Sequence, residues 1–222
     1  MYEHRKTAQR HELEYNLHLL SVVGCSVDGL EIQPSLIVHP KSIHRIEKLL
    51  TSKGILATES VVVLHPGSGG SARDWSAKKF GELAQRLGNI PNIRVVITGK
   101  KEEAQLVNEV MEYADPKAVP LIDFESLREF AALAQRATLF VANSTGPIHI
   151  AAAVGTYVIG LYPQITALSA TRWSPYTKQK TIFSPVGKPI DCKKCLQTNV
   201  CECMDSISVD DVYQDAVRHL GK

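Results

Sequence analysis

A run of small, polar and turn-forming residues interrupts the apolar centre of the chain, in the segment FVANSTGPIHIAAAVGT that starts at residue 140. Pro147 suits the first turn of a helix, because the N–H that it lacks would have no partner there. The backbone N–H groups that follow would point out of the helix end, where they favour an anion. Ser144 and Thr145 add hydroxyls to this turn, and Gly146 would let a phosphate group approach closely. The segment therefore predicts an anion-binding turn.

His149 would lie one turn inside that helix, and it has two interpretations. One is a half-buried histidine whose hydrogen bonds are satisfied by its neighbours. The adjacent Ser-Thr-Gly sequence favours the other, a histidine that faces the bound anion.

A second loop, HPGSGGSARDW at residues 65–75, also exposes backbone N–H groups. It formally contains G-x-G-x-x-A, but a dinucleotide site also needs an acidic residue after the second strand, and none stands there. No Gly-Lys-Ser/Thr follows, which excludes a Walker A loop. Ser68, Gly69 and the guanidinium of Arg73 can together hold a phosphate through charge-assisted hydrogen bonds. A flexible strand-to-helix connection is the alternative interpretation of this loop.

Two further side chains near these loops have competing interpretations. Asp74 follows Arg73 directly, which predicts a surface ion pair rather than a catalytic acid. Trp173 could form a wall against a nucleotide, but a hydrophobic lid or an exposed interface explains it equally well.

Apolar runs that alternate with amphipathic segments indicate how the two loops are positioned. Continuous apolar runs are typical of strands that are buried on both faces, and short connections join them to helices. We expect a Rossmann-like parallel sheet with helices on both faces, followed by an irregular segment over residues 163–207. The predicted strands are residues 61–65, 93–99, 119–123, 138–143 and 157–162, and the predicted helices include residues 11–20, 42–50 and 147–153. Ligands bind outside the carboxyl ends of such strands, so both loops would lie at the binding edge and favour a diphosphate.

Composition excludes several other classes of protein. The chain has 222 residues, 44% of them hydrophobic, and a net charge of +2, with Lys and Arg scattered rather than clustered as nucleic-acid binding requires. The first residues lack the apolar stretch of a secretory signal, and the longest apolar run is shorter than the roughly 20 residues of a membrane span. We therefore expect a cytoplasmic protein without a transmembrane segment, with the inner face of the membrane as an alternative location.

Four of the five cysteines cluster in DCKKCLQTNVCECM. The first pair has a zinc-like C-x-x-C spacing, but the second pair is separated by one residue and no histidine lies nearby. In a cytoplasmic protein this favours structural thiols or a local disulfide over zinc. The four residues are Cys192, Cys195, Cys201 and Cys203.

Four ordered motifs carry a resemblance to a known family. They are LHPGSGGSARDWSAKKFGELAQRL, VVITGKKEEAQLV, LFVANSTGPIHIAAAVGT and CMDSISVDDV. Together they resemble the C-terminal half of the lipopolysaccharide heptosyltransferases, glycosyltransferase family nine, from about Ser60 to the end of the chain. Residues 1–30 resemble the family's interdomain helix, and residues 31–222 then form a nucleotide-sugar-binding domain.

The resemblance implies the C-terminal, donor-binding domain of a GT-B glycosyltransferase, which inverts the anomeric centre without a metal or cofactor. The donor is typically ADP-heptose, so a nucleotide-diphosphate sugar is the implied partner. By position, Arg73 matches a basic residue at the donor phosphates, and Glu102 or Glu103 matches an acid near the ribose. Thr145, Gly146 and His149 match the diphosphate-binding helix start.

Two departures from the family pattern limit what the resemblance implies. Ser144 stands where many heptosyltransferases have an aspartate that contacts the sugar, which leaves another sugar open. The N-terminal domain, which holds the acceptor and the expected catalytic base, has no counterpart here, so no catalytic residue is predicted and the chain alone is expected to be inactive. A separately encoded N-terminal domain and self-association are both expected as partners. A stand-alone, non-catalytic nucleotide- or protein-binding module is the alternative function.

Overall fold

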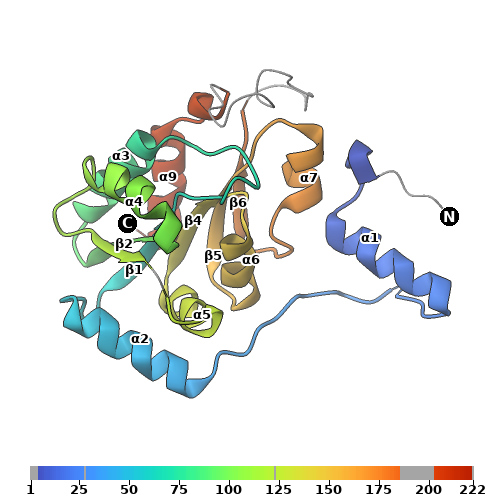
Figure 1. Cartoon of the computed structure of the whole chain (residues 1–222), viewed down its shortest axis with the longest axis horizontal. Coiled ribbons are helices and arrows are strands. Elements are labelled where there is room, and N and C mark those ends of the chain that lie inside the picture. Colours follow the sequence, from blue (N-terminus) through green and yellow to red (C-terminus); the bar gives the residue numbers. More distant parts are fainter. Residues whose placement is uncertain (1–4, 28, 123, 186–202, 222) are drawn as a thin grey trace.

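A parallel β-sheet with helices on both faces forms the body of the protein (Figure 1), and this confirms the predicted Rossmann-like class. The computed structural model describes residues 5–27, 29–122, 124–185 and 203–221. Six strands of this described part form one sheet in the order β3-β2-β1-β4-β5-β6, and each neighbouring pair is parallel. They are β1 (Ser60–His65), β2 (Ile93–Gly99), β3 (Val119–Ile122), β4 (Leu139–Asn143), β5 (Tyr157–Leu161) and β6 (Lys180–Phe183).

Alternating side chains of the strands supply two cores, one on each face of the sheet. Val62 and Leu64 of β1 pack in one cluster with side chains of α3 (Ala77–Gly88), α4 (Ala104–Met111) and α9 (Val209–Leu220). Val61 and Val63 point to the opposite face. There they pack with side chains of α2 (Pro40–Ser52), α5 (Leu127–Arg136) and α6 (Gly146–Ala153). Both faces are thus covered, as the continuous apolar strands predict.

Two elements differ from the predicted ones. The segment that we expected to be irregular contains β6 and the short helix α7 (Ala170–Trp173). All four residues of β6 are only partly buried, so the edge strand lacks the apolar run by which the inner strands are recognised. The predicted helix over residues 11–20 ends earlier, as α1 (Glu12–His18), and its buried side chain is Tyr15. Leu20 lies beyond the end of α1 and is 39% exposed, so the predicted helix is too long at its C-terminal end.

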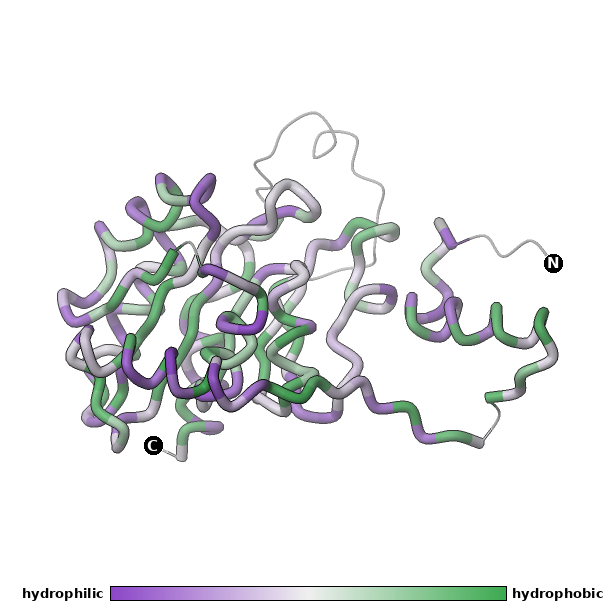
Figure 2. The backbone as a smooth tube through the Cα atoms, turned by 60° about the horizontal axis from the view of Figure 1, so that its bottom comes forward, coloured by the Kyte–Doolittle hydropathy of each residue, from purple (hydrophilic) through white to green (hydrophobic). Residues whose placement is uncertain are grey.

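An N-terminal arm, residues 5–27, lies beside the body next to α7 (Figure 1). It contains η1 (Arg5–Thr7), α1 and the 3-10 helix η2 (Leu19–Val23), and a connector of residues 29–39 leads from it to α2. Apolar side chains of η2 face outward, which gives the far end of the arm its hydrophobic colour in Figure 2. The exposed ones are Leu19, Leu20, Val22 and Val23.

Close contact between α3 and α4 depends on Gly81, and we predict that Gly81→Ala destabilises the fold. A Cβ at Gly81 would lie 2.6 Å from the backbone oxygen of Val110 and 2.5 Å from Cβ of Tyr113. The free energy of unfolding should fall by about 1–3 kcal/mol, although alanine is otherwise the better helix former. Urea denaturation would measure this, with Gly146→Ala as the control because its added Cβ meets no atom within 4 Å. Equal stability of the two variants would contradict the prediction.

Candidate functional site

The two loops singled out in the sequence lie at one edge of the sheet. β1 and β4 are adjacent and parallel, and His65, the last residue of β1, lies opposite Ala142 of β4. The glycine loop, residues 66–75, and the turn at residues 144–147 therefore leave the sheet side by side. This is the edge at which ligands bind in open parallel sheets.

Asn143, the last residue of β4, connects the two loops. Its side-chain Nδ2 donates to the backbone oxygen of Pro66 at 2.6 Å, and its Oδ1 accepts from the backbone N–H of Trp75 at 3.0 Å. The residue is fully buried, so these two bonds replace water for the amide and for both backbone groups. Asn143 thus holds both ends of the glycine loop against the start of the turn. The sequence analysis missed this role, although an amide that closes a wholly apolar strand was the available signal.

Glu103, from the 3-10 turn after β2, holds the glycine loop from the other side. One carboxylate oxygen accepts from the N–H of Gly69 at 3.2 Å, and the other accepts from the N–H of Lys100 at 2.9 Å. A Cβ on Gly67 would lie 2.2 Å from this carboxylate, so glycine is required there. Glu102 is exposed. The sequence left both glutamates open, and the structure places Glu103 against the loop.

A cavity of about 400 Å³ opens beside the turn at the end of β4. It brings together four of the predicted site residues, Ser144, Thr145, Gly146 and His149, with Ser71 of the glycine loop. The other side of the cavity is formed by Ala167, Leu168, Arg172 and Trp173. The remaining predicted site residues do not line this cavity; they are Ser68, Gly69, Arg73, Glu102 and Glu103.

The start of α6 has the local structure that the sequence predicts. Thr145 occupies the N-cap position in an extended conformation, and Pro147 lies in the first turn. Within the described chain, the Thr145 side chain makes no capping hydrogen bond, so the first N–H groups of α6 are not satisfied by it. The Ser144 hydroxyl is hydrogen-bonded to Tyr162, whose own hydroxyl donates to the backbone oxygen of Trp173 at 2.9 Å. Ser144 is thereby linked to the far wall of the cavity.

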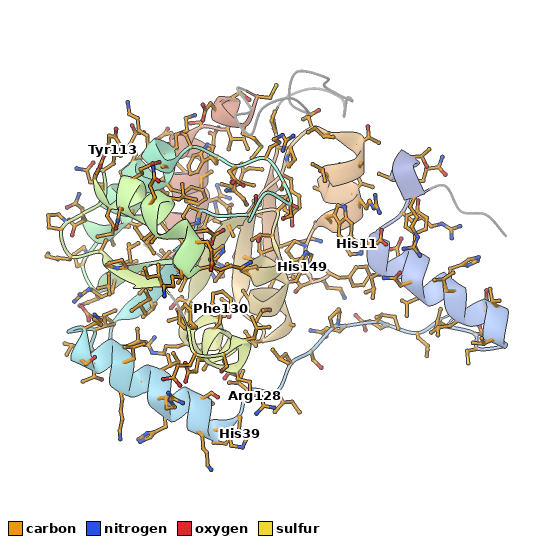
Figure 3. The ribbon with its side chains drawn as sticks, in the orientation of Figure 1. His11, His39, Tyr113, Arg128, Phe130 and His149 are labelled. Carbon is orange, nitrogen blue, oxygen red and sulfur yellow. The ribbon has the colours of Figure 1, made fainter. Side chains whose placement is uncertain are left out.

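His149 is partly buried, and its surroundings favour the neutral imidazole. Burial lowers the pKa of His149, and electrostatic interactions with His11 and Lys180 lower it further. Figure 3 shows His149 on α6 and His11 at the start of α1, on facing sides of the body and the arm. A neutral imidazole can accept or donate one hydrogen bond beside a bound anion without adding charge.

Asp74 differs from its predicted role as half of a surface ion pair. Its carboxyl is partly withdrawn from solvent, and within the described residues its Oδ1 is buried without a hydrogen-bond partner. Burial raises the pKa of Asp74 to about 6, against the lowering effects of Ser68 and of the Arg73 charge. Asp74 is therefore partly buried within the glycine loop, and the prediction that it lies at the surface is wrong.

His65 lies beneath the glycine loop in a buried hydrogen-bonded position. Its Nδ1 is 2.9 Å from the hydroxyl of Thr98, which in turn donates to the backbone oxygen of Leu64. The ring also contacts Phe130 edge-on, at a centroid distance of 6.0 Å. Desolvation lowers the pKa of His65 to about 4, despite the opposing effect of Glu103.

The cysteine cluster lies mostly outside the described residues, so the choice between zinc and thiols is not decided. Of its members, Cys203 is described, and it is an exposed residue that precedes the 3-10 turn Met204–Ser206. Among the residues that the structure describes, no group of three or more potential metal ligands occurs. No helix in that part of the chain is long and apolar enough to cross a membrane.

Comparison with known proteins decides the family. The family model of glycosyltransferase family 9, the heptosyltransferases, matches residues 1–203. The chain belongs to this family. Lipopolysaccharide heptosyltransferase 3 of Escherichia coli is 29% identical over 174 residues, which are 77% of this chain and 49% of that protein.

Solved structures of family 9 proteins share the fold. The glycosyl transferase family 9 protein from Veillonella parvula has a TM-score of 0.82 at 20% identity, over 99% of this chain and 62% of its own. E. coli heptosyltransferase WaaC with ADP has a TM-score of 0.66 at 17% identity, over 98% of this chain and 59% of its own. This family 9 chain thus spans between 49% and 62% of the length of these three relatives.

We predict that Asn143→Ala destabilises the site and the fold together. The change leaves the Pro66 carbonyl and the Trp75 N–H buried without their partner, at a cost of about 1–3 kcal/mol for each group. The free energy of unfolding, from urea denaturation, should fall by at least about 2 kcal/mol. Asn108→Ala, on the exposed side of α4, is the matched control and should change it little. A fall of the same size in both variants would contradict the role given to Asn143.

We also predict a pH dependence of stability that His65 causes. Its pKa is about 4 in the folded chain, below the ordinary histidine value of 6.5 that applies to the unfolded chain, so folding favours the neutral ring. This contribution is complete above pH 6.5 and is lost as the pH falls toward 4. Relative to wild type, His65→Gln should therefore lose less stability between about pH 7 and pH 4. Urea denaturation at both pH values measures the difference, and parallel losses in the two proteins would refute the prediction.

Proposed function

We propose that this chain binds the nucleotide-diphosphate sugar donor of a heptosyltransferase-like enzyme of lipopolysaccharide core biosynthesis. One observation carries the proposal: Thr145, Gly146 and His149 at the start of α6 share a cavity with Ser71 of the glycine loop. Backbone N–H groups in the glycine loop after β1 and at the start of α6 after β4 can each bind one of two linked phosphates. The relatives support the nucleotide, because structures of E. coli WaaC are described with ADP and with ADP-2-deoxy-2-fluoro heptose.

In this proposal the diphosphate lies between the glycine loop and the start of α6. The first N–H groups of α6 and the hydroxyl of Thr145 bind one phosphate, and the guanidinium of Arg73 binds the other. The predicted contribution of Gly69 is dropped, because its N–H donates to Glu103. Glu103 acts beside the nucleoside end and keeps the loop in place through Gly69. Neutral His149 lies at the sugar-proximal side of the turn.

The identity of the sugar depends on Ser144. The hydroxyl of Ser144 is bonded to Tyr162, so the position offers a neutral and already partnered group. In the family that the sequence resembles, this position is often an aspartate. Its carboxylate would instead accept hydrogen bonds from sugar hydroxyls. We therefore propose an ADP-heptose-like donor whose sugar receives fewer hydrogen bonds from residue 144 than it would from an aspartate.

Transfer itself requires groups that we place outside this chain. An inverting reaction needs a base for the acceptor hydroxyl, and we assign that base to the acceptor-binding N-terminal domain of a GT-B enzyme. Residues 1–30 would be the interdomain segment and residues 31–222 the donor domain. The exposed apolar side chains of η2 fit a surface that the acceptor domain covers. Self-association through the same surface is the alternative that light scattering distinguishes.

A second candidate, a binding module without turnover, is favoured by the chemistry of the cavity. Among the described residues, its lining contains no carboxylate, and its histidine is partly buried. Release of ADP from ADP-heptose in the presence of acceptor separates the two functions. If ADP is released only after an acceptor domain is added, the chain is the donor half of an enzyme. If the nucleotide binds but is not turned over, with or without the acceptor domain, the chain is a binding module.

We predict that ADP binds and that Thr145→Val weakens the binding. Loss of one hydrogen bond, about 1 kcal/mol, should raise the Kd about five-fold in isothermal titration calorimetry. Thr138→Val is the matched control, because Thr138 is an exposed residue near the opposite end of β4. Titration with UDP in place of ADP tests whether the site distinguishes adenine from uracil. Absence of heat from wild type with millimolar ADP would overturn the proposed function.

A further inference from the structure

The N-terminal arm contacts the body through an ion pair that is largely withdrawn from solvent. Glu12 of α1 accepts from Nε of Arg172 at 2.8 Å, and the two side chains are 13% and 16% exposed. The other carboxylate oxygen of Glu12 accepts from Arg5 at 2.5 Å. Both oxygens of Glu12 therefore bind guanidinium groups, one from the arm and one from α7. Such a pair differs from an exposed one, because removal of one partner leaves the other charge poorly solvated.

Arg172 also belongs to the wall of the candidate cavity, opposite the start of α6. Its guanidinium carbon lies 4.8 Å from the ring centroid of Trp173, which lines the same cavity. The indole N–H of Trp173 donates to the backbone oxygen of Ala167 at 2.9 Å, and a weaker bond joins Arg172 to the same oxygen. The arm thus holds, through Glu12, a cation–π pair that forms one side of the cavity.

His11 makes a second contact between the arm and the same wall. Its Nδ1 accepts the N–H of Leu13 and caps α1, so its Nε2 carries the proton and donates to the backbone oxygen of Ser174 at 2.6 Å. The ring also packs against Tyr176 at a centroid distance of 4.9 Å. Contacts on both sides of Trp173, at residues 172 and 174, therefore depend on the first turn of α1.

We propose that Glu12 is a positioning residue of the cavity: by binding Arg172 it fixes the Arg172–Trp173 pair, so that docking of the arm and occupation of the cavity stabilise each other. Without the carboxylate, Arg172 loses its partner and the pair is no longer held in one geometry. A ligand that contacts this wall must then order the two side chains when it binds, and this cost lowers its affinity. By linkage, a ligand that binds better to the docked form must strengthen docking by the same factor. The effect on ligand affinity rests on the proposed function, whereas the effect on Trp173 does not.

The two tryptophans of the chain offer a direct measurement. Trp75 is 1% exposed in the core, and Trp173 lies in the cavity wall. In protein labelled with 5-fluorotryptophan, Glu12→Ala should shift or broaden the ¹⁹F resonance of Trp173 and leave that of Trp75 unchanged. The constant Trp75 signal shows that the variant is folded, and Trp173→Phe assigns the two resonances.

Glu31→Ala is the matched control, because Glu31 of the connector pairs with Lys178 at 3.0 Å but both side chains are largely exposed, at 80% and 94%. This variant removes an ion pair between the N-terminal region and the body without touching the cavity wall. It should leave both resonances unchanged. An unaltered Trp173 resonance in Glu12→Ala, or equal changes in the two variants, would overturn the positioning role.

Titration with ADP then tests the coupling to the site. Glu12→Ala should raise the Kd about five-fold or more, and Glu31→Ala should leave it within about two-fold of wild type. Hydrogen exchange of the α1 amides should slow in wild type when ADP binds. Equal ADP affinity in wild type and Glu12→Ala would overturn the coupling. If wild type binds no ADP, the proposed function fails, and the Trp173 resonance still decides whether Glu12 positions the wall.

Discussion

The side-chain amide of Asn143 is the contact on which the arrangement of the site depends. A parallel sheet places the ends of β1 and β4 side by side, but the strands do not determine how the two loops lie beyond their ends. Asn143 does so by donating to the Pro66 carbonyl and accepting from the Trp75 N–H. Because the amide is fully buried, either bond is costly to lose, and the glycine loop is held at both ends beside the start of α6.

The glycine loop is further defined by close packing against Glu103. The carboxylate takes the place that a side chain at residue 67 would occupy, and it accepts from the Gly69 N–H. Asp74 lies partly buried within the same loop. Glu103 therefore occupies the N–H of Gly69, which is not available to another acceptor. The loop is thus a held structure rather than a flexible connection, which was its alternative interpretation.

The arm adds a constraint that lies far from the glycine loop in sequence but close to the cavity. Glu12 and His11 both reach the segment that carries Arg172 and Trp173. A segment that the family resemblance assigns to the connection between domains therefore touches the wall of the candidate cavity. This contact links the position of the arm to the geometry of the cavity, because Glu12 and the cavity share Arg172.

The sequence by itself determined the sheet, most of the helices, and the position of the turn at Ser144, Thr145 and Gly146 where α6 begins. Those features depend on local periodicity and on residues next to one another in the chain. Only the tertiary structure decided between Glu102 and Glu103, gave Asn143 its role, withdrew Asp74 from the surface and joined Glu12 to Arg172. Glu12 and Arg172 are separated by 160 positions. Burial and hydrogen-bond partners at that separation arise from how the elements pack, and no local pattern of residues encodes them.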